Sequence, residues 1–460
     1  MQKRTLAGLG YYKNILSIAI PIIIQSGITN FVNLLDNIMV GQVGTVPMSG
    51  VSIVNGLLFV FNLCVFGASS GAGIFTAQFH GSKDETGVRY TFRFKFLSCV
   101  LLALVGIGIF TFAGDPIIGL YLTGEGDPAM AGEVLEFGHK YLRIMIWGFL
   151  PFAVSNAYSS TLRETGAPMV PMAAGICAVG VNLILNYILI FGHLGFEAMG
   201  VEGAALATVI SRFVEMTIVA AWTHSHPNRH GYIRGVFRSF RIPVRLLKNI
   251  IAKGMPLLIN EFLWASGMAT ITQCYSTCGL DVVPALNISR TLFDVGGVVF
   301  ISLGNAVGII MGQLLGSGLR PEEIRQHNRK LMSFATVVGG SFGLLMIAAS
   351  HLFPLLYNTT DDVRLLAARL ICVNGLMLPF NSYTNASYYT LRSGGQALVT
   401  FLFDSCFVWG LCVPLAYCLS RFTGVPILIL YCIVQATEFA KCLLGGYMIK
   451  QGKWIQNLTV

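Results

Sequence analysis

Long apolar runs, separated by short polar segments, follow one another along the whole chain. Each run has about 20 residues or more, which is the length that a helix needs to cross roughly 30 Å of hydrocarbon. The sustained alternation of apolar and polar residues that is typical of a membrane β-barrel is absent from the sequence. We therefore predict an all-α polytopic membrane protein with twelve transmembrane helices. The expected spans are 14–40, 48–79, 91–113, 135–162, 168–192, 200–223, 248–277, 282–315, 331–350, 363–391, 397–419 and 425–449.

The composition indicates that lipid is the solvent for much of this chain. Hydrophobic residues make up 54% of the 460 positions, charged residues make up only 11%, and the mean hydropathy is +0.69. Soluble domains usually contain about a quarter charged residues. A soluble core of this size would not need so much apolar surface.

The net charge of +9 is concentrated on one side of the predicted membrane. Most of the 30 Lys and Arg residues lie in the termini and after the second, fourth, sixth, eighth and tenth spans, whereas an opposite loop carries Asp115, Glu125 and Asp127. This distribution follows the positive-inside rule. It predicts a multi-pass protein of the cytoplasmic (inner) membrane with both termini in the cytoplasm. Because no single basic face is indicated, we expect no nucleic-acid partner.

The second half of the chain resembles the first half at a constant offset. Pro21 and Pro256 are 235 residues apart, and the same offset relates 78–82 (QFHGS) to 313–317 (QLLGS). Both five-residue segments lie where the second span of a half meets a basic loop. The ends of the two fourth spans are also similar, because Thr-Leu-Arg begins at Thr161 and again at Thr390.

This internal repeat predicts the domain organisation. Each half has six spans, an even number, so both halves enter the membrane from the same side and form parallel repeats. We expect two pseudo-symmetric six-helix bundles, 1–223 and 248–460, joined by a basic cytoplasmic linker at 224–247. Rocking of two such bundles can expose a central cleft to either side in turn.

Several charged residues lie inside the predicted spans, where an isolated charge costs about 3 kcal/mol or more. A partner three or four residues away on the same helix is the simplest way to meet this cost. Asp404 lies near the cytoplasmic end of its span, where we expect it to reach water. The expected local pairs are Arg212 with Glu215, Arg290 with Asp294, and Glu438 with Lys441.

Two carboxylates, Asp36 and Glu261, have no cation three or four residues away on either side. Asp36 also ends a polar stripe in which Gln25, Thr29 and Asn33 recur at helical spacing. Such a stripe must face protein or water rather than lipid. One interpretation is a hydrogen-bond network that holds helices together, and the other is a site that binds a proton or another cation.

Asparagines add polarity to two further spans. Asn182 and Asn186 are four residues apart and therefore share one face of the fifth span, and Asn381 lies on the tenth. Asparagine side chains hydrogen-bond helices together in many membrane proteins. A structural role for these residues therefore stays open beside a role in binding.

These residues resemble a known family. The first span, from Pro21 through Gln25 to 36–41 (DNIMVG), resembles the opening of the multidrug and toxic compound extrusion (MATE) transporters. The segments 182–192 (NLILNYILIFG) and 200–208 (GVEGAALAT) resemble the same family, and the similarity extends over nearly the whole chain. The resemblance implies export of cationic or amphipathic organic compounds, driven by inward flow of protons or sodium ions.

The resemblance also implies roles for individual residues. MATE transporters carry an aspartate at the place of Asp36, in a cavity of the N-terminal half. Polar residues of the fifth span and a threonine of the sixth line the same cavity, and they correspond to Asn182, Asn186 and Thr208. The implied sodium site consists of Asp36, Asn182 and Asn186. Asn33, from the polar stripe, is a further candidate for binding the cation or the substrate.

The chain departs from both branches of the family that it resembles. The DinF-type branch usually has aspartate where this chain has Asn186. The NorM-type branch usually has a glutamate deep in the seventh span and an aspartate in the tenth, but here Glu261 lies about one turn earlier and Asn381 takes the place of the aspartate. The resemblance therefore leaves both the proton and the sodium ion open as the coupling ion.

Together these features predict a secondary active multidrug exporter that works by alternating access and antiport. We expect small organic cations or amphipathic drugs as substrates, a proton or sodium ion as coupling ion, no other cofactor, a lipid bilayer as environment and a monomer as functional unit. The alternative is a lipid-linked precursor flippase of the same superfamily, which would need more basic residues in its central cavity. We do not expect an enzyme, since HExxH and paired intramembrane aspartates are absent from the sequence.

Overall fold

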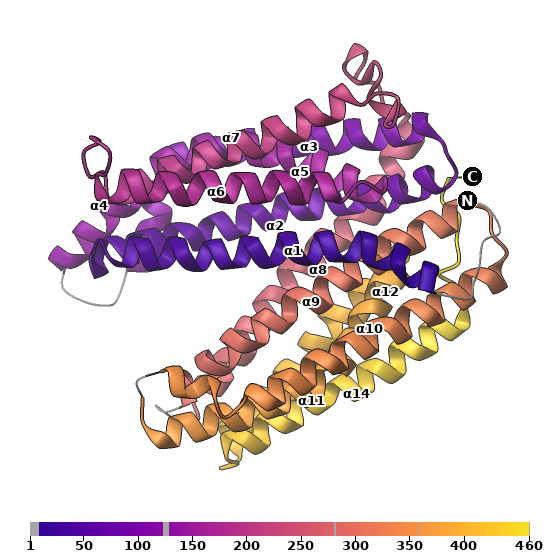
Figure 1. The fold of residues 1–460 in the computed structure, drawn as a ribbon. Coiled ribbons are helices and arrows are strands. Elements are labelled where there is room, and N and C mark those ends of the chain that lie inside the picture. The colour runs from indigo at the N-terminus through magenta and orange to yellow at the C-terminus, as the bar shows by residue number, and fades with distance from the viewer. Residues whose placement is uncertain (1–8, 123–127, 280–281, 358, 460) are drawn as a thin grey trace. The chain divides into compact units, whose positions relative to one another are not determined.

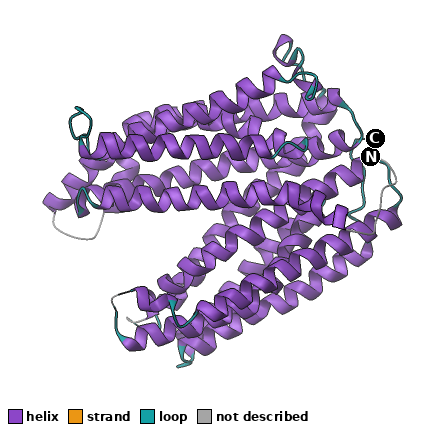
Figure 2. Ribbon diagram, in the orientation of Figure 1, coloured by secondary structure: helices purple, strands orange, loops and turns teal. Residues whose placement is uncertain are grey.

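The computed structural model describes residues 9–122, 128–279, 282–357 and 359–459, which within these ranges form helices and no strand (Figures 1 and 2). The predicted all-α fold class is confirmed. The α-helices are α1 (Leu9–Gly41), α2 (Thr45–Gly81), α3 (Glu85–Leu122), α4 (Pro128–Met145), α5 (Phe149–Glu164), α6 (Met169–Phe191), α7 (Val201–Ser225), α8 (Val244–Ser276), α9 (Val282–Gly316), α10 (Pro321–Ala349), α11 (Asp361–Ser393), α12 (Ala397–Phe401), α13 (Val413–Phe422) and α14 (Ile427–Gln451).

Each of the twelve predicted spans corresponds to one helix or to one interrupted helix. Nine helical stretches of the described chain are long and apolar enough, taken alone, to cross a membrane. The predicted spans outside that set are α1, α8 and the α4–α5 pair, and all of these contain charged residues. A 3-10 turn at Ile146–Gly148 joins α4 to α5, so the fourth span is a broken helix.

Some helices extend well beyond the apolar runs that predicted them. The helix α10 begins at Pro321, whereas the predicted span begins at 331. Arg320 and Glu323 form a capping box there, and Pro321 occupies the first turn. These polar capping residues start a helix in water, where hydropathy carries no signal.

The chain folds into two compact units, each described here by itself. Within the described residues, the N-terminal unit comprises 24–76 and 84–250, and the C-terminal unit comprises 9–23, 77–83 and 251–459. The segment 9–23 joins the C-terminal unit because Ile15 and Ala19 pack into its hydrophobic clusters beside α9. The domain boundaries at 223 and 248 stay a prediction.

The N-terminal unit has a core of small and aromatic side chains between α2, α3, α5 and α7. Phe61 of α2 stacks on Phe149 of α5 with ring centroids 4.1 Å apart, and Phe110 of α3 meets Phe149 edge to face. Alanines such as Ala153 and Ala205 are fully buried and let the helices approach closely. This packing fixes the helices that surround α6.

In the C-terminal unit, α11 lies between α9 and α10 and also contacts α14. Between α12 and α13 the backbone is π-helical over Leu402–Cys406 and Val408–Cys412. Such π segments are rare and change the direction in which side chains point. Asp404 lies on the first of them.

The two repeated QxxGS segments pack against each other within the C-terminal unit. A Cβ atom on Gly81 would collide with the backbone of Gln313, and one on Gly316 would collide with the backbone of Gln78. The 235-residue offset relates Gly81 to Gly316 and Gln78 to Gln313, so the two contacts are equivalent under the repeat. The repeat therefore places a glycine on each of the two helices, α2 and α9, where they cross closely.

Candidate functional site

Four of the predicted site residues meet inside the N-terminal unit. Asp36 comes from α1, Asn182 and Asn186 come from one face of α6, and Thr208 comes from α7. The two asparagines are 3% and 1% exposed. The structure thus brings together a carboxylate, two amides and a hydroxyl from three helices.

Hydrogen bonds connect these groups into one chain. The amide nitrogen of Asn186 donates to Asp36 Oδ1 at 2.6 Å and to Asn182 Oδ1 at 3.1 Å. Asn182 in turn donates to Thr208 Oγ1 at 3.3 Å, and this hydroxyl donates to the Ala204 carbonyl at 3.0 Å. Both neighbours of the Asn186 nitrogen are acceptors, which fixes the orientation of that amide.

One acceptor in this cluster lacks a donor. Asn186 Oδ1 is buried and has no hydrogen-bond partner within the described chain. An unsatisfied buried oxygen is costly, and such groups often mark a site for an ion or a water molecule. Asn186 also donates the hydrogen bond to Asp36, so its Oδ1 lies close to the Asp36 carboxylate. A cation bound here could contact both oxygens.

The Asp36 carboxylate is not neutralised by an arginine. The charge of Arg212 of α7 acts on Asp36, but this guanidinium pairs with Glu215 at 3.7 Å and stacks over the Phe152 ring at 4.7 Å. Among the residues that the structure describes, Asp36 forms no ion pair. Within the described chain, its hydrogen-bond donor is the neutral amide of Asn186.

Two of the remaining predicted site residues, Glu261 and Asn381, lie outside this cluster. Asn33 lies on α1, but its side chain is outside the described residues. Glu261 of α8 lies in the C-terminal unit, where Arg392 of α11 approaches it to 3.8 Å. Asn381 is eleven residues before Arg392 on α11, about 16 Å along the helix, so Glu261 and Asn381 do not form one site.

Two of the three expected local ion pairs are present. Arg212 and Glu215 form one, and Arg290 and Asp294 form the other at 3.8 Å. The third expectation is wrong. Lys441 pairs with Asp404 at 2.7 Å rather than with Glu438, which accepts a hydrogen bond from Thr384.

The expectation that Asp404 simply reaches water is also wrong. Its side chain is 17% exposed and accepts hydrogen bonds from Lys441 and, at 3.1 Å, from Asn260. The π-helical segment around Asp404 turns this carboxylate toward α8 and α14. Spacing along a single helix could not show either contact.

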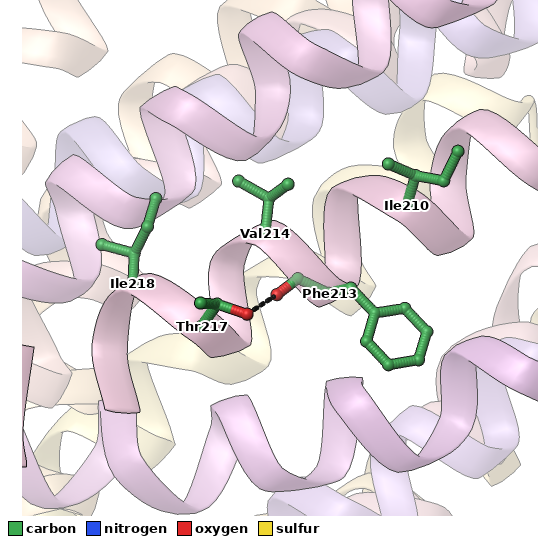
Figure 3. A pocket seen from close by; sticks show the side chains of 5 residues that line it. All are labelled: Ile210, Phe213, Val214, Thr217 and Ile218. Atoms are coloured by element: carbon green, nitrogen blue, oxygen red, sulfur yellow. Dashed lines mark hydrogen bonds between the residues drawn. The ribbon is translucent and has the colours of Figure 1, made fainter. Parts of the chain in front are cut away.

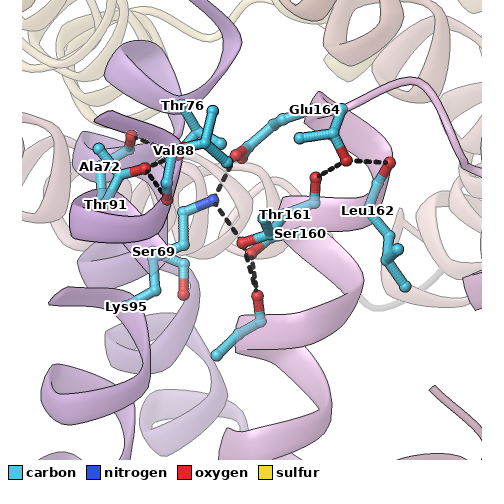
Figure 4. Close-up of polar contacts among 12 residues, drawn as sticks. Ser69, Ala72, Thr76, Val88, Thr91, Lys95, Ser160, Thr161, Leu162 and Glu164 are labelled. Carbon is cyan, nitrogen blue, oxygen red and sulfur yellow. Dashed lines mark hydrogen bonds and ion pairs between the residues drawn. The ribbon is translucent and has the colours of Figure 1, made fainter. Parts of the chain in front are cut away.

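A buried ion pair in the N-terminal unit was not among the predicted site residues. Lys95 of α3 is fully buried and pairs with Glu164 at the end of α5, and it also donates to Thr161 Oγ1 at 3.4 Å (Figure 4). Gly73 of α2 leaves room for the carboxylate. Lys95 lies inside the predicted span 91–113, but its partner is on another helix, which spacing along one span cannot show.

One serine matches a hydrolase pattern by chance. Gly67–Gly71 (GASSG) has the spacing G-x-S-x-G, which in hydrolases is a sharp turn between a strand and a helix. Here the segment lies in the middle of α2. Ser69 is buried, accepts a hydrogen bond from Asn156 at 2.8 Å and contacts Cys99, so it is a packing residue.

A shallow apolar groove runs along one stripe of α7 (Figure 3). Its only side-chain polar group is the Thr217 hydroxyl, which donates to the Phe213 carbonyl at 2.7 Å. The groove therefore offers no ligand for an ion. The lining residues are Ile210, Phe213, Val214, Thr217 and Ile218.

Comparison with known proteins decides the family. The MatE family model matches the chain twice, over residues 21–188 and 256–418, and the two matches start 235 residues apart (256 minus 21). The chain belongs to the MatE family. The double match confirms the internal repeat and the predicted resemblance to MATE transporters.

Curated MatE relatives align over almost their whole length. A "Probable multidrug resistance protein YoeA" of Bacillus subtilis is 26% identical over 442 residues, covering 95% of this chain and 92% of the relative. A "Probable multidrug resistance protein NorM" of Thermotoga maritima is 23% identical over 452 residues, covering 96% and 93%.

Solved structures of MATE transporters share this fold. An outward-facing multidrug resistance MATE transporter of the MOP superfamily superposes with a TM-score of 0.82 at 20% identity, covering 98% of this chain and 100% of that one. The Vibrio cholerae MATE transporter VcmN gives a TM-score of 0.83 at 17% identity, covering 97% and 98%. This MatE protein therefore has a transporter fold.

Proposed function

We propose that this MatE protein exports small organic cations or amphipathic drugs by antiport with protons or sodium ions. The observation that carries the proposal is the polar cluster of the N-terminal unit. There, among the residues that the structure describes, Asp36 has no ion-pair partner and lies beside Asn186 Oδ1, a buried acceptor without a donor. The names of the relatives, which are multidrug resistance proteins, support the choice of drugs as substrates.

The mechanism rests on competition for one negative charge. In the outward-facing state, Asp36 takes up a proton or sodium ion and releases the drug. In the inward-facing state, it loses that ion and attracts a cation from the cytoplasm. Because both ligands need the same carboxylate, their binding is mutually exclusive, and one pH unit of gradient supplies about 1.4 kcal/mol per proton, or about tenfold accumulation.

The chemistry of the cluster suits either coupling ion. Sodium is a hard cation that prefers carboxylate, amide and hydroxyl oxygens, and Asp36, Asn182, Asn186 and Thr208 carry these groups. A proton would need only the carboxylate. In this proposal the amides orient Asp36, and Thr208 orients Asn182 through the hydrogen bond between them.

We place the protein in the cytoplasmic membrane with both termini inside the cell, as a monomer without a further cofactor. The concentration of basic residues in the termini and alternate loops supports this orientation. Each bundle then carries its own polar cluster. Glu261, Arg392 and Asp404 in the C-terminal unit are paired, which favours a structural role for them.

Efflux from everted vesicles tests this function. In everted vesicles the cytoplasmic face is outside, so a cationic dye is added outside, and its transport into the lumen is followed while a pH gradient and a sodium gradient are imposed separately. We expect dye movement that depends on one of the two gradients. Movement independent of both gradients would contradict antiport, and no movement of any cationic dye would favour the lipid-linked precursor flippase.

A further inference from the structure

The connection between α7 and α8 is an ordered segment. Two 3-10 turns, Gly231–Ile233 and Val236–Arg238, shape it, and Tyr232, Ile233 and Val236 are buried against the N-terminal unit. We call residues 229–248 the basic belt. A tether that only joins two halves of a chain would not need such a fixed backbone.

Two arginines of α3 hold the basic belt in place. Arg89 donates to the carbonyls of Tyr232 at 3.0 Å and Gly231 at 3.3 Å. Arg93, which is 7% exposed, donates to the carbonyls of Val236 at 2.8 Å and of Gly235 and Arg241 at 3.2 Å. Five hydrogen bonds from cations thus fix a segment that is itself cationic.

The outer surface of the basic belt carries a concentration of positive charge. No aspartate or glutamate occurs between Glu215 and Glu261, and Glu85 of α3 is the carboxylate that lies against Gly231. Uncompensated like charges repel one another, so an anionic partner would stabilise this arrangement. The exposed basic side chains are Arg229, Arg234, Arg238, Arg241, Arg245 and Lys248.

Exposed apolar side chains alternate with these arginines. Phe240 is 48% exposed and precedes Arg241, and Val244 is 65% exposed and precedes Arg245. Phe237, which precedes Arg238, is 41% exposed and packs against Phe96 with ring centroids 5.2 Å apart. Side chains of this kind are favoured at the boundary between lipid headgroups and acyl chains.

We propose that the basic belt binds the phosphate groups of anionic phospholipids, with Phe240 and Val244 inserted among the acyl chains. The belt lies where one membrane helix, α7, ends and the next, α8, begins, so headgroups are within reach. A soluble polyanion would match the arginines but would leave the exposed apolar side chains in water. Lipid satisfies both features.

The test compares lipid retention by the full chain and its variants. Purified protein is titrated with phosphatidylglycerol or phosphatidylcholine, and bound lipid is counted by native mass spectrometry. The belt variant carries Arg238→Gln, Arg241→Gln and Arg245→Gln. Since each basic residue near an anionic surface contributes about a fivefold factor in affinity, we expect phosphatidylglycerol binding to weaken at least about tenfold.

A matched control removes three exposed cations elsewhere. Arg325→Gln, Arg329→Gln and Lys450→Gln change the net charge equally, but no exposed large apolar side chain is adjacent in sequence to these positions. This control should retain phosphatidylglycerol as the unsubstituted protein does. Equal binding by the belt variant and the control would overturn the proposal.

The test includes a second variant and a second ligand. If the belt variant folds poorly, Phe240→Ser replaces it, and the proposal requires that this variant also loses phosphatidylglycerol while its melting temperature stays unchanged. A short RNA serves as a soluble polyanion. Preference of the unsubstituted protein for RNA over phosphatidylglycerol would overturn the choice of lipid.

Discussion

Asp36 owes its position to Asn186 rather than to a charge. The hydrogen bond of 2.6 Å between them lies in a cluster where Asn182 and Thr208 supply the next groups. A neutral hydrogen-bond donor can orient a carboxylate without neutralising its charge, as a lysine or arginine would do. This arrangement leaves the negative charge open to ligands that come and go.

Replacement of Asn186 by alanine should impair this site. A hydrogen bond to a charged group contributes about 1.5–3 kcal/mol, so we expect ion-driven dye efflux to fall at least about tenfold. The control is Asn374→Ala in the C-terminal unit, where a buried asparagine bonds Ser289 and Tyr431. That variant should lower the melting temperature but keep the response to the ion gradient. Unchanged efflux by Asn186→Ala would argue against the role of this residue.

The pair of Lys95 and Glu164 should act on stability rather than on transport. Lys95→Met leaves a buried carboxylate without its cation, which typically costs 3–5 kcal/mol. The double variant Lys95→Met, Glu164→Leu removes both charges and should recover most of the loss. Thermal unfolding compares the stability of the unsubstituted protein, the single variant and the double variant. A single variant as stable as the unsubstituted protein would show that the pair does not stabilise the fold.

At the scale of helices, the crossing of α2 and α9 depends on two glycines. Gly81 and Gly316 face the backbone of Gln313 and Gln78, so the two helices approach more closely than any side chain would allow. Gln78 is also fully buried and bonds the Ser393 carbonyl at 2.9 Å and the Leu458 amide at 2.7 Å. The crossing therefore also anchors the C-terminal tail.

A side chain at this crossing should force the helices apart. We expect Gly316→Val to destabilise the protein by about 1–3 kcal/mol or more, since overpacking shifts backbone atoms. The control is Gly108→Val on α3, where an added Cβ meets no atom within 4 Å. Melting temperatures of the two variants decide the matter. Equal values would contradict the close approach of α2 and α9.

The helices could be predicted from the sequence because apolar runs longer than about 20 residues leave few alternatives. Their ends could not, since polar turns such as the start of α10 at Pro321 extend into water. Pro151 at the start of α5 has no amide proton to donate, so it is a local signal for the break between α4 and α5 that hydropathy alone does not register. The π segment at Leu402–Cys406 contains neither proline nor glycine, so no local helix breaker marked it.

At the scale of the whole molecule, the internal repeat was predictable and the ion pairs between helices were not. The three matching segments correspond to two copies of one family model. The Asp36 cluster was also predictable, because Asn182 and Asn186 share one helical face and the family resemblance placed them near Asp36. The contacts of Lys441 with Asp404 and of Arg392 with Glu261 join distant helices, which spacing within one helix cannot reveal.

The central claim is that a drug and the coupling ion compete for Asp36. Its most direct test is the equilibrium binding of a fluorescent organic cation to the purified protein at a series of pH values and sodium concentrations. The account predicts that the apparent Kd rises as protons or sodium ions are added, and that Asp36→Asn, while remaining folded, binds the dye weakly with no such dependence. Asp36→Asn binding with the affinity and ion dependence of the unsubstituted protein would contradict the account.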